Sequence, residues 1–501
     1  MPNLLWDNPA YVLGEPSQGK NKDTERLRKR AQEQFESFLS KIKEVFPVPE
    51  RPPEIDAVLK FLTLHKKEAT KHPLWEDIKT TGGNITFQIK GRPELVCQSE
   101  MVKKTIAEKA SSEEQNQMIC LVTGEPDTPV RLHSAIKGVR GTQSTGGNIV
   151  SFNLDAFNSY GKTQGFNAPV GLRAEFQYTT SLNELLKRDS RHRLLIADTT
   201  TVFWAERENK MEEWFYEIFG EPSGLSDEQD AEAVRALFKS PETGTPPYID
   251  DPTRFYVLGL APNAARIAIR FWYAGTVGEV ARNIRQHFDD LSIIHREIEP
   301  DYPSLFRLLI STAAQAKADN IPPNLAGDVM RAILEGTPYP QSLLSAVIRR
   351  IRAEQKVTYP RAALIKAVLT RKNRYYRLER KEVGMALDRE NRNQGYLLGR
   401  LFAVLEKVQE EANPGVNATI RDRFYGAASS TPATVFPLLL KLKNHHLAKL
   451  QNKGRVVNLE KLIGEIMDGL QDLPRHLSLE DQGRFAVGYY HQRQDFFRKP
   501  E

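Results

Sequence analysis

Two spacings of apolar residues divide the chain near residue 279. Before it, several short stretches alternate apolar and polar residues, as half-buried strands do, and a few stretches have helical spacing. After it, apolar residues recur every three or four positions almost to the end, which is the pattern of amphipathic helices. The sequence therefore predicts an α+β fold: a mixed N-terminal body with antiparallel strands, followed by an all-helical C-terminal bundle.

The same spacings predict individual elements. The expected helices of the N-terminal half are 23–46, 55–65 and 180–188, and the expected strands are 85–90, 118–123, 149–154 and 200–204. The most apolar block, 255–275, predicts two more strands joined by a turn, and we interpret residues 255–272 of it and Trp204 as core rather than as a platform for stacked bases. Residues 207–246 are acidic and amphipathic and are expected to be exposed. The helices expected in the C-terminal half are 279–296, 303–318, 323–334, 340–354, 360–383, 385–412, 416–426, 431–450, 458–470 and 478–496.

Three segments are expected within this plan. Residues 1–300 would form the α+β body, residues 301–384 a basic helical connector, and residues 385–501 the C-terminal helical bundle. A chain of 501 residues is long enough for several domains.

Composition narrows the possible classes of protein only a little. The 70 lysines and arginines exceed the 64 acidic residues, so the net charge of +6 favours an anionic partner weakly. Two cysteines, Cys97 and Cys120, cannot make a zinc site of paired cysteines, and they favour a reducing, cytoplasmic location. There is no run of about 18 apolar residues that would predict a membrane span. We expect no metal and no cofactor.

One glycine-rich stretch, KGVRGTQSTGGNIVSFNLD over residues 137–155, has the chemistry of a nucleic-acid loop. Glycines let a backbone approach a polyanion, amide side chains can read base edges, and flanking cations contact phosphates. An ordinary hairpin connection explains the same residues. The candidate DNA-binding residues of this loop are Lys137, Arg140, Gln143, Ser144, Thr145, Gly146, Gly147 and Asn148.

Positive charge is concentrated in a second stretch, residues 349–381. It holds twelve bases against two acids, which gives 12 − 2 = +10, and Tyr375 and Tyr376 lie inside it. Basic helices with interleaved aromatic residues suit a sugar-phosphate backbone, although a charge run is also the usual face of a solvated helix. The candidate backbone contacts are Lys162, Arg349, Arg350, Arg352, Arg371, Lys372, Arg374 and Arg377.

Two enzymatic alternatives remain open. Residues 156–163 satisfy a relaxed P-loop pattern that ends in Lys162, and the strand before Asp198 resembles a Walker B strand, but bulky residues fill the loop and no helix is expected to follow it. A metal-dependent nuclease would need paired carboxylates such as Asp198 and Glu206, or a cluster such as His287-Phe-Asp289-Asp290. The adjacent His445 and His446 point about 100° apart on a helix and cannot readily share a metal. We expect no enzymatic activity.

Several long blocks together resemble one known family. They are LLWDNPAYVLG at the start, GTQSTGGNIVSFNLDAFNSYGKTQGFNAPV, ADTTTVFWAE and FYVLGLAPNAARIAIRFW. In this order they resemble the large subunit of the type I-C CRISPR effector complex (Cascade), of the Cas8c/Csd family. The resemblance covers most of the chain.

The resemblance implies an antiviral, non-enzymatic subunit of an RNA-guided ribonucleoprotein. Its expected task is to recognise the protospacer-adjacent motif in duplex DNA, to aid strand opening and R-loop formation, and to recruit a separate helicase–nuclease. Its expected partners are a guide RNA, the target double-stranded DNA, the backbone subunits and the subunit that binds the 5′ handle of the guide. In such systems the protein reads the short motif while guide pairing reads the sequence.

Two further expectations follow from the family. Its small subunit is commonly made by internal translation, and Met385 would be the internal start of a product that covers residues 385–501. A methionine on a helix is the ordinary alternative. Family members usually carry a further segment before LLWDN, so residues that read the motif could also lie in such a segment.

Overall fold

The computed structural model describes residues 2–16, 24–81, 83–112, 117–220, 250–264, 266–322, 324–378 and 383–497. Most of the predicted acidic segment, residues 221–246, lies outside these ranges, as do Arg380 and Lys381 of the basic stretch. Within the described residues, no helix is both long and apolar enough to cross a membrane.

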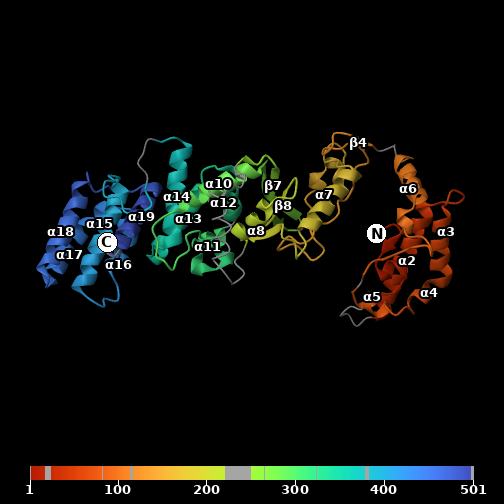
Figure 1. Ribbon diagram of the computed structural model, residues 1–501, viewed down its shortest axis with the longest axis horizontal. Coiled ribbons are helices and arrows are strands. Elements are labelled where there is room, and N and C mark those ends of the chain that lie inside the picture. The colour runs from red at the N-terminus through yellow and green to blue at the C-terminus, as the bar shows by residue number, and fades with distance from the viewer. Residues whose placement is uncertain are drawn as a thin grey trace. The chain divides into compact units, whose positions relative to one another are not determined.

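The chain forms two compact units. The first contains Met1–Arg131 and Phe166–Ala174, and the second contains Leu132–Gly165 and Glu175–Glu501. The predicted segments 1–300, 301–384 and 385–501 stay a prediction; the second unit contains part of the first segment and the whole of the other two. The α+β fold class is confirmed, with small antiparallel sheets in the N-terminal half and helices in the C-terminal half (Figure 1).

The first unit is helical with two small sheets. Its long helix α2 buries Phe38 and Ile42 against neighbouring apolar residues, and Phe46, just after the helix, is buried with them. This confirms the predicted helix 23–46. Pro52 and Pro53 start the next helix because proline fits the first turn, where no intrahelical N–H bond is lost. The elements are β1 (Trp6–Asp7), α1 (Pro9–Val12), α2 (Thr24–Val45), α3 (Pro53–Lys60), the π-helical turn Phe61–His65, α4 (Lys66–Ala69), α5 (Trp75–Thr81), β2 (Ile85–Thr86), α6 (Glu100–Ser112), β3 (Met118–Ile119) and β4 (Pro126–Asp127).

The second unit is built on a four-stranded antiparallel sheet in the order β5-β6-β7-β8. The strands are β5 (Arg193–Ile196), β6 (Thr199–Ala205), β7 (Arg254–Asn263) and β8 (Arg266–Thr276). The two strands expected in the apolar block and the one expected at 200–204 are confirmed. The strand expected at 149–154 is wrong, because these residues form bends without a pairing strand.

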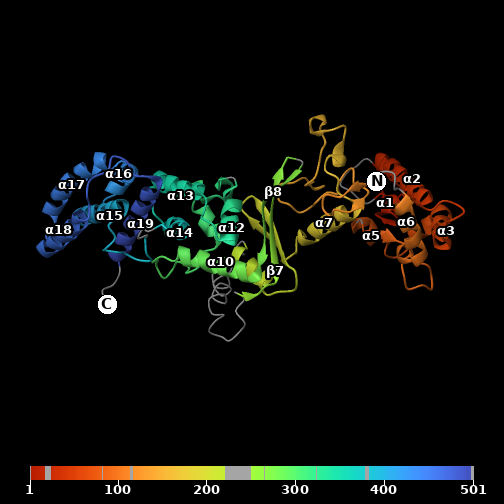
Figure 2. The same cartoon turned by 90° about the horizontal axis from the view of Figure 1, so that it is seen from above.

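The two faces of this sheet are covered differently. On one face Phe203, Phe255 and Phe271 pack into a core with helices α8 (Met211–Phe219), α10 (Val277–Leu291) and α12 (Leu325–Glu335). The helix on the other face is α7 (Leu172–Leu185) (Figure 2). Leu182 of α7 and Leu186, just after it, pack there. Leu182 and Leu186 contact only part of that face: the edge strand β8 keeps exposed residues there.

The rest of the second unit is helical, as expected. Helix α10 starts directly after β8 in a capping box, in which Thr276 and Glu279 bond each other's backbone N–H groups. The expected helices 303–318 and 385–412 are too long, since the first ends at Ile310 and Asn393 caps the second. The helices are α11 (Leu305–Ile310), α13 (Gln341–Glu354), α14 (Tyr359–Tyr375), α15 (Gln394–Ala412), α16 (Ile420–Ala428), α17 (Pro432–Lys449), α18 (Lys453–Asp468) and α19 (Leu479–Asp495).

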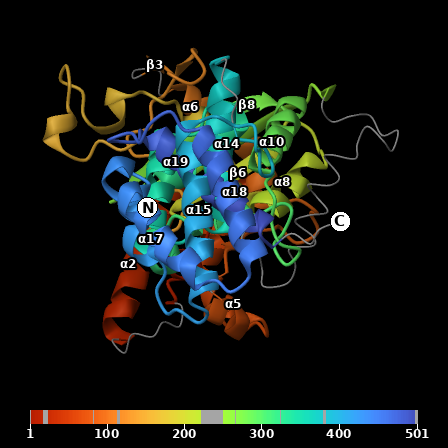
Figure 3. The same ribbon diagram turned by 90° about the vertical axis from the view of Figure 1, so that its left-hand side faces the viewer.

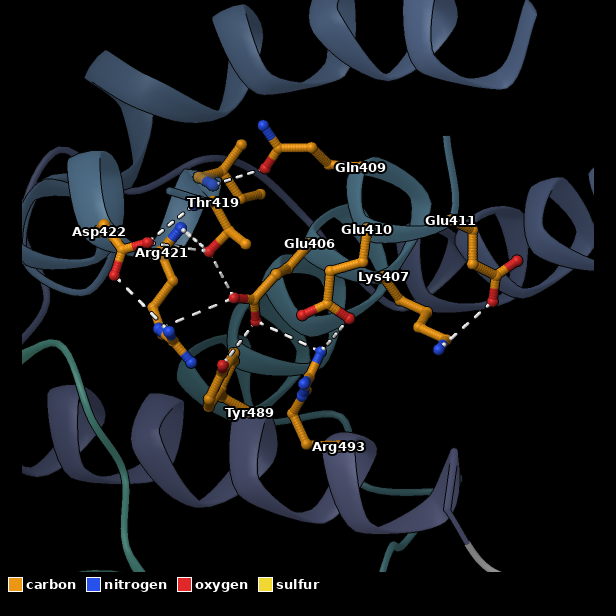
Figure 4. Close-up of polar contacts among 11 residues, drawn as sticks. Glu406, Lys407, Gln409, Glu410, Glu411, Thr419, Arg421, Asp422, Tyr489 and Arg493 are labelled. Carbon is orange, nitrogen blue, oxygen red and sulfur yellow. Dashed lines mark hydrogen bonds and ion pairs between the residues drawn. The ribbon is translucent and has the colours of Figure 1, made fainter. Parts of the chain in front are cut away.

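Helix α15 is the centre of the C-terminal bundle, and α17, α18 and α19 surround it (Figure 3). Its fully buried Glu406 accepts hydrogen bonds from Thr419 Oγ1 at 2.7 Å and Tyr489 Oη at 2.6 Å. Arg421 and Arg493 lie within 3.8 Å of the same carboxylate (Figure 4). One buried charge with several partners therefore ties α15 to the start of α16 and to α19.

A buried histidine gives this bundle a pH-dependent stability. His491 on α19 is 1% exposed, and its Nδ1 lies 3.0 Å from Tyr396 Oη on α15. Burial, and then the nearby Lys366, lower the pKa of His491 to about 4. Because the unfolded chain takes up a proton more readily between pH 6.5 and 4, the stability is present above about pH 6.5 and is lost as the pH falls.

We predict that lowering the pH from 7 to 5 costs the wild type about 2 kcal/mol more of unfolding free energy than it costs His491→Phe. Chemical denaturation at the two pH values measures this difference. The exposed His476 supplies the control, and His476→Phe should behave as wild type. Equal pH dependence in wild type and His491→Phe would contradict the assignment.

Candidate nucleic-acid interface

The glycine-rich residues 137–148, called the motif loop below, form a closed turn on the sheet. Ile136 and Gly147 exchange backbone hydrogen bonds of 2.8 and 2.9 Å, and the N–H of Gly146 donates to the carbonyl of Gln143 at 2.8 Å. Gly146 has a φ of +94°, and a Cβ there would lie 2.6 Å from the Ile136 carbonyl oxygen. Glycine is therefore required at this position.

The predicted residues of the motif loop divide into a tip and a base. Gln143, Ser144 and Thr145 are exposed at the tip. At the base, the Asn148 side-chain amide donates to the carbonyl of His133 at 2.7 Å, so it is already engaged inside the protein. Gly147 is buried in the bridge to Ile136.

The two predicted cations of the loop have exposed side chains, while their backbones are anchored. The N–H of Lys137 donates to Asn183 Oδ1 at 2.8 Å, and that of Arg140 donates to Thr200 Oγ1 at 3.0 Å. Asn183 lies on α7 and Thr200 on β6. The loop is thus held at both cations by the scaffold, and its cationic side chains face solvent.

A second loop, residues 153–163, lies beside the motif loop. The start of β8 joins the two loops. The N–H of Ile267 donates to the Asn148 carbonyl of the motif loop at 3.0 Å. The guanidinium of the adjacent Arg266 donates to Asn153 Oδ1 of the second loop at 2.7 Å and lies 4.5 Å from the Phe157 ring centre. Sequence reasoning missed Arg266, because its contact with Asn153 joins residues 113 positions apart and a cation inside an apolar strand gives no local signal of such a contact.

The second loop is not a phosphate-binding P-loop. Ser159 and Lys162 close a tight turn, with Tyr160 and Gly161 at φ values of 50° and 71°. A short 3₁₀ turn follows instead of a helix, so no helix N-terminus points at the loop. Lys162 is exposed beside Tyr160, whose side chain is 99% exposed.

The nuclease geometry is absent as well. Asp198 and Glu206 flank opposite ends of β6, about 25 Å apart at the usual rise of a strand. His287 bonds Tyr339 Oη, and burial lowers its pKa well below the ordinary value. No group of three His, Cys, Asp or Glu side chains that could hold a metal occurs among the described residues.

The basic stretch separates into an inner and an outer set of cations on α13 and α14. The inner set makes ion pairs or hydrogen bonds within the protein: Arg350 and Arg361 pair with Glu354, and Lys372 pairs with Glu480. Burial lowers the pKa of Lys366, which donates to the Asp290 carbonyl at 2.9 Å.

The centre of the inner set is Asp290 on α10. Its carboxylate, 1% exposed, accepts hydrogen bonds from Arg371 Nε at 2.7 Å and from both terminal nitrogens of Arg374 at 2.7 and 2.9 Å. Arg371 is also 1% exposed, and its guanidinium lies 4.3 Å from the Tyr339 ring centre. The hydrogen bonds to Asp290 raise the pKa of Arg374, which keeps 43% of its side chain exposed. We therefore leave Arg371 out of any surface for nucleic acid.

The outer set faces solvent. Arg349, Arg352 and Lys356 are exposed along α13 and the turn after it, and no acidic partner is found for them among the described residues. At the other end of the hairpin, three residues are exposed where α14 ends: Tyr375 at 53%, Tyr376 at 57%, and Arg377.

Met385 lies between α14 and α15, outside any helix, and is 60% exposed. Its carbonyl accepts a hydrogen bond of 2.8 Å from the N–H of Ile294. The helix-forming part of the bundle begins after it, at Gln394. An internal translation start at Met385 stays a prediction.

We predict that Asp290→Asn lowers the free energy of unfolding by about 3–5 kcal/mol, because it leaves the buried guanidinium of Arg371 without a counter-charge. Thermal or chemical denaturation of the purified protein measures this loss. Asp289→Asn is the matched control, since the neighbouring Asp289 is exposed and should tolerate the change. Equal stability of the two variants would show that Asp290 does not hold α14.

The family model described as CRISPR-associated protein (Cas_Csd1) matches residues 1–497. The search of curated proteins returned no match. The match spans nearly the whole chain and confirms the resemblance to the large subunit of the type I-C CRISPR effector complex. The chain therefore belongs to the CRISPR-associated Csd1 family.

Proposed function

We propose that this chain is the large subunit of an RNA-guided surveillance complex and that it recognises the protospacer-adjacent motif in duplex DNA through the motif loop. The observation that carries the proposal is the exposed tip of Gln143, Ser144 and Thr145, preceded in the same loop by the exposed cations Lys137 and Arg140, on a chain of the Csd1 family. Base edges are read by amide and hydroxyl groups, and phosphates are held by cations.

The anchoring of the loop supports this role. A base-reading side chain needs a fixed position, and the hydrogen bonds of Asn148, Lys137 and Arg140 to the scaffold fix the loop before DNA arrives. Gln143 is the amide side chain left at the tip. We therefore assign base contact to Gln143 and a positioning role to Asn148.

The outer cations support contact with the sugar-phosphate backbone. Arg349, Arg352 and Lys356 form an exposed basic row, and Arg377 lies beside two exposed tyrosines. Phosphates contribute most of non-specific affinity, and aromatic rings stack on unpaired bases. Lys162 on the second loop adds a cation near the motif loop, and the exposed part of Arg374 adds one on α14.

The remaining parts of the proposal follow from the family. The chain would aid strand opening and R-loop formation, sit with guide RNA, backbone subunits and the subunit that binds the 5′ handle, and recruit a helicase–nuclease. Residues 385–501, started at Met385, would supply small subunits. The protein itself would have no nuclease activity. It would act in the cytoplasm.

We predict that Gln143→Ala lowers the preference of the reconstituted complex for motif-bearing duplex by about 1–3 kcal/mol, the usual worth of one base-edge pair. Dissociation constants for duplexes with and without the motif, at one salt concentration, measure this preference. Lys137→Ala and Arg140→Ala should weaken binding to both duplexes alike, because phosphate contacts carry no sequence information.

The matched control is Gln451→Ala, which removes an exposed glutamine from the turn before α18. It should bind as wild type. A Gln143→Ala complex that keeps the full preference for the motif would contradict the assignment of the reading role to this loop.

A further inference from the structure

A cluster of three aromatic rings lies on the face of the sheet that α7 covers only in part. Trp204 on β6 and Tyr256 on β7 have ring centres 5.4 Å apart, and Trp272 on β8 lies 5.9 Å from Tyr256 and 5.8 Å from Trp204. Both contacts of Tyr256 are stacked, at interplanar angles of 23° and 24°. The three rings therefore support one another in fixed orientations.

Trp272 is not a core residue. Its side chain is 49% exposed, and Ile269 on the same strand is 52% exposed. The expectation that the whole block is core is right for Phe255, Val257 and Phe271, which are buried, and wrong for Trp272. An indole held in place by two other rings, with half of its surface open, is arranged to stack on a further flat group.

Arginines flank the cluster, together with one exposed acid, Glu206, whose N–H donates to the Arg254 carbonyl at 2.9 Å. Arg254 is exposed two residues before Tyr256 on β7, so strand alternation turns it to the same face. Arg193 on β5 is paired with Val202, whose side chain packs on this face beneath α7, and cross-strand partners share a face. Aromatic rings beside arginines match the flat bases and charged phosphates of an unpaired nucleic-acid strand.

The face is also continuous with the motif loop. Strand β8 begins at Arg266, which contacts both the motif loop and the second loop, and reaches Trp272 about 20 Å further on at the rise of a strand. The motif loop and Trp272 therefore lie along one strand, so the ring is within reach of a DNA strand released from a duplex at the loop. Paired bases offer no open ring surface to Trp272, whereas unpaired bases do.

We propose that Trp272, supported by Tyr256 and Trp204, is a stacking site for unpaired bases of single-stranded DNA. The site rests on the proposed function, because the motif loop brings the DNA to the sheet, but it assigns a binding role to residues outside that loop. Trp272 touches the base, while Tyr256 and Trp204 position its ring.

The test compares variants of the reconstituted complex for binding to a single-stranded oligothymidine, an oligouridine and a motif-bearing duplex. Trp272→Ala should weaken oligothymidine binding roughly five- to a hundredfold, the usual effect of removing the ring from one stacked base. Trp272→Tyr should retain most of the affinity, since it keeps an aromatic ring. Phe176→Ala, which removes another exposed aromatic side chain, at α7, should bind as wild type.

Several outcomes would overturn the site. The first is that Trp272→Ala binds oligothymidine as tightly as wild type does. The second is that Trp272→Ala loses more affinity for oligouridine than for oligothymidine. The third is that Trp272→Ala lowers the yield of assembled complex while the complex that does assemble binds DNA normally. The last result would make the cluster a contact with a protein subunit.

The same experiment separates this site from the proposed function. Gln143→Ala should affect only the motif-bearing duplex, and Trp272→Ala should affect oligothymidine. If wild type showed no preference for the motif but Trp272→Ala still bound oligothymidine weakly, the stacking site would stand and the motif role of the loop would fail.

Discussion

The buried ion pairs of Asp290 engage part of the basic stretch within the fold and so separate it from the cations that face solvent. Two arginines of α14 converge on this one carboxylate of α10, and one of them, Arg371, is as buried as the carboxylate. An unpaired charge at such a depth is costly, so the fold needs both partners. The cations that pair with Asp290 join α14 to α10, whereas Arg349 and Arg352 of α13 and Lys356 after it are exposed.

A similar division between holding and contacting groups runs through the motif loop. Asn148 and the backbones of Lys137 and Arg140 are used by the scaffold, whereas Gln143 and the two cationic side chains are presented to solvent. The aromatic cluster follows the same rule, with Tyr256 and Trp204 holding the ring of Trp272. In the motif loop the polar residue types predicted contact, whereas the aromatic block predicted core, and in both places only the fold determines which side chains are exposed.

Sequence reasoning predicted the fold class and most helices because helical spacing survives over many residues. It failed at 149–154, where alternating residues lack a neighbouring strand to pair with, and pairing is a long-range property. It also could not separate Arg371 from Arg349, since both are arginines on basic helices and their roles differ only through Asp290, 81 residues away from Arg371.

The exposed aromatic residues show the same limit. Trp272 and Phe271 are adjacent in one apolar block, and strand alternation places them on opposite faces, but the sequence does not say that α7 leaves Trp272 open. The family could be predicted because several long blocks occur in order, and such a match does not depend on knowing which side chains face solvent.

The salt dependence of DNA binding tests the central claim most directly, namely that the outer cations bind phosphates while the inner ones hold the fold. The complex that carries Arg349→Ala, Arg352→Ala and Lys356→Ala together should melt as wild type. Its plot of log affinity against log salt concentration should be shallower by about 2–3, roughly one unit for each phosphate that the variant no longer neutralises. An unchanged slope would contradict the account, because it would mean that these exposed cations touch no phosphate.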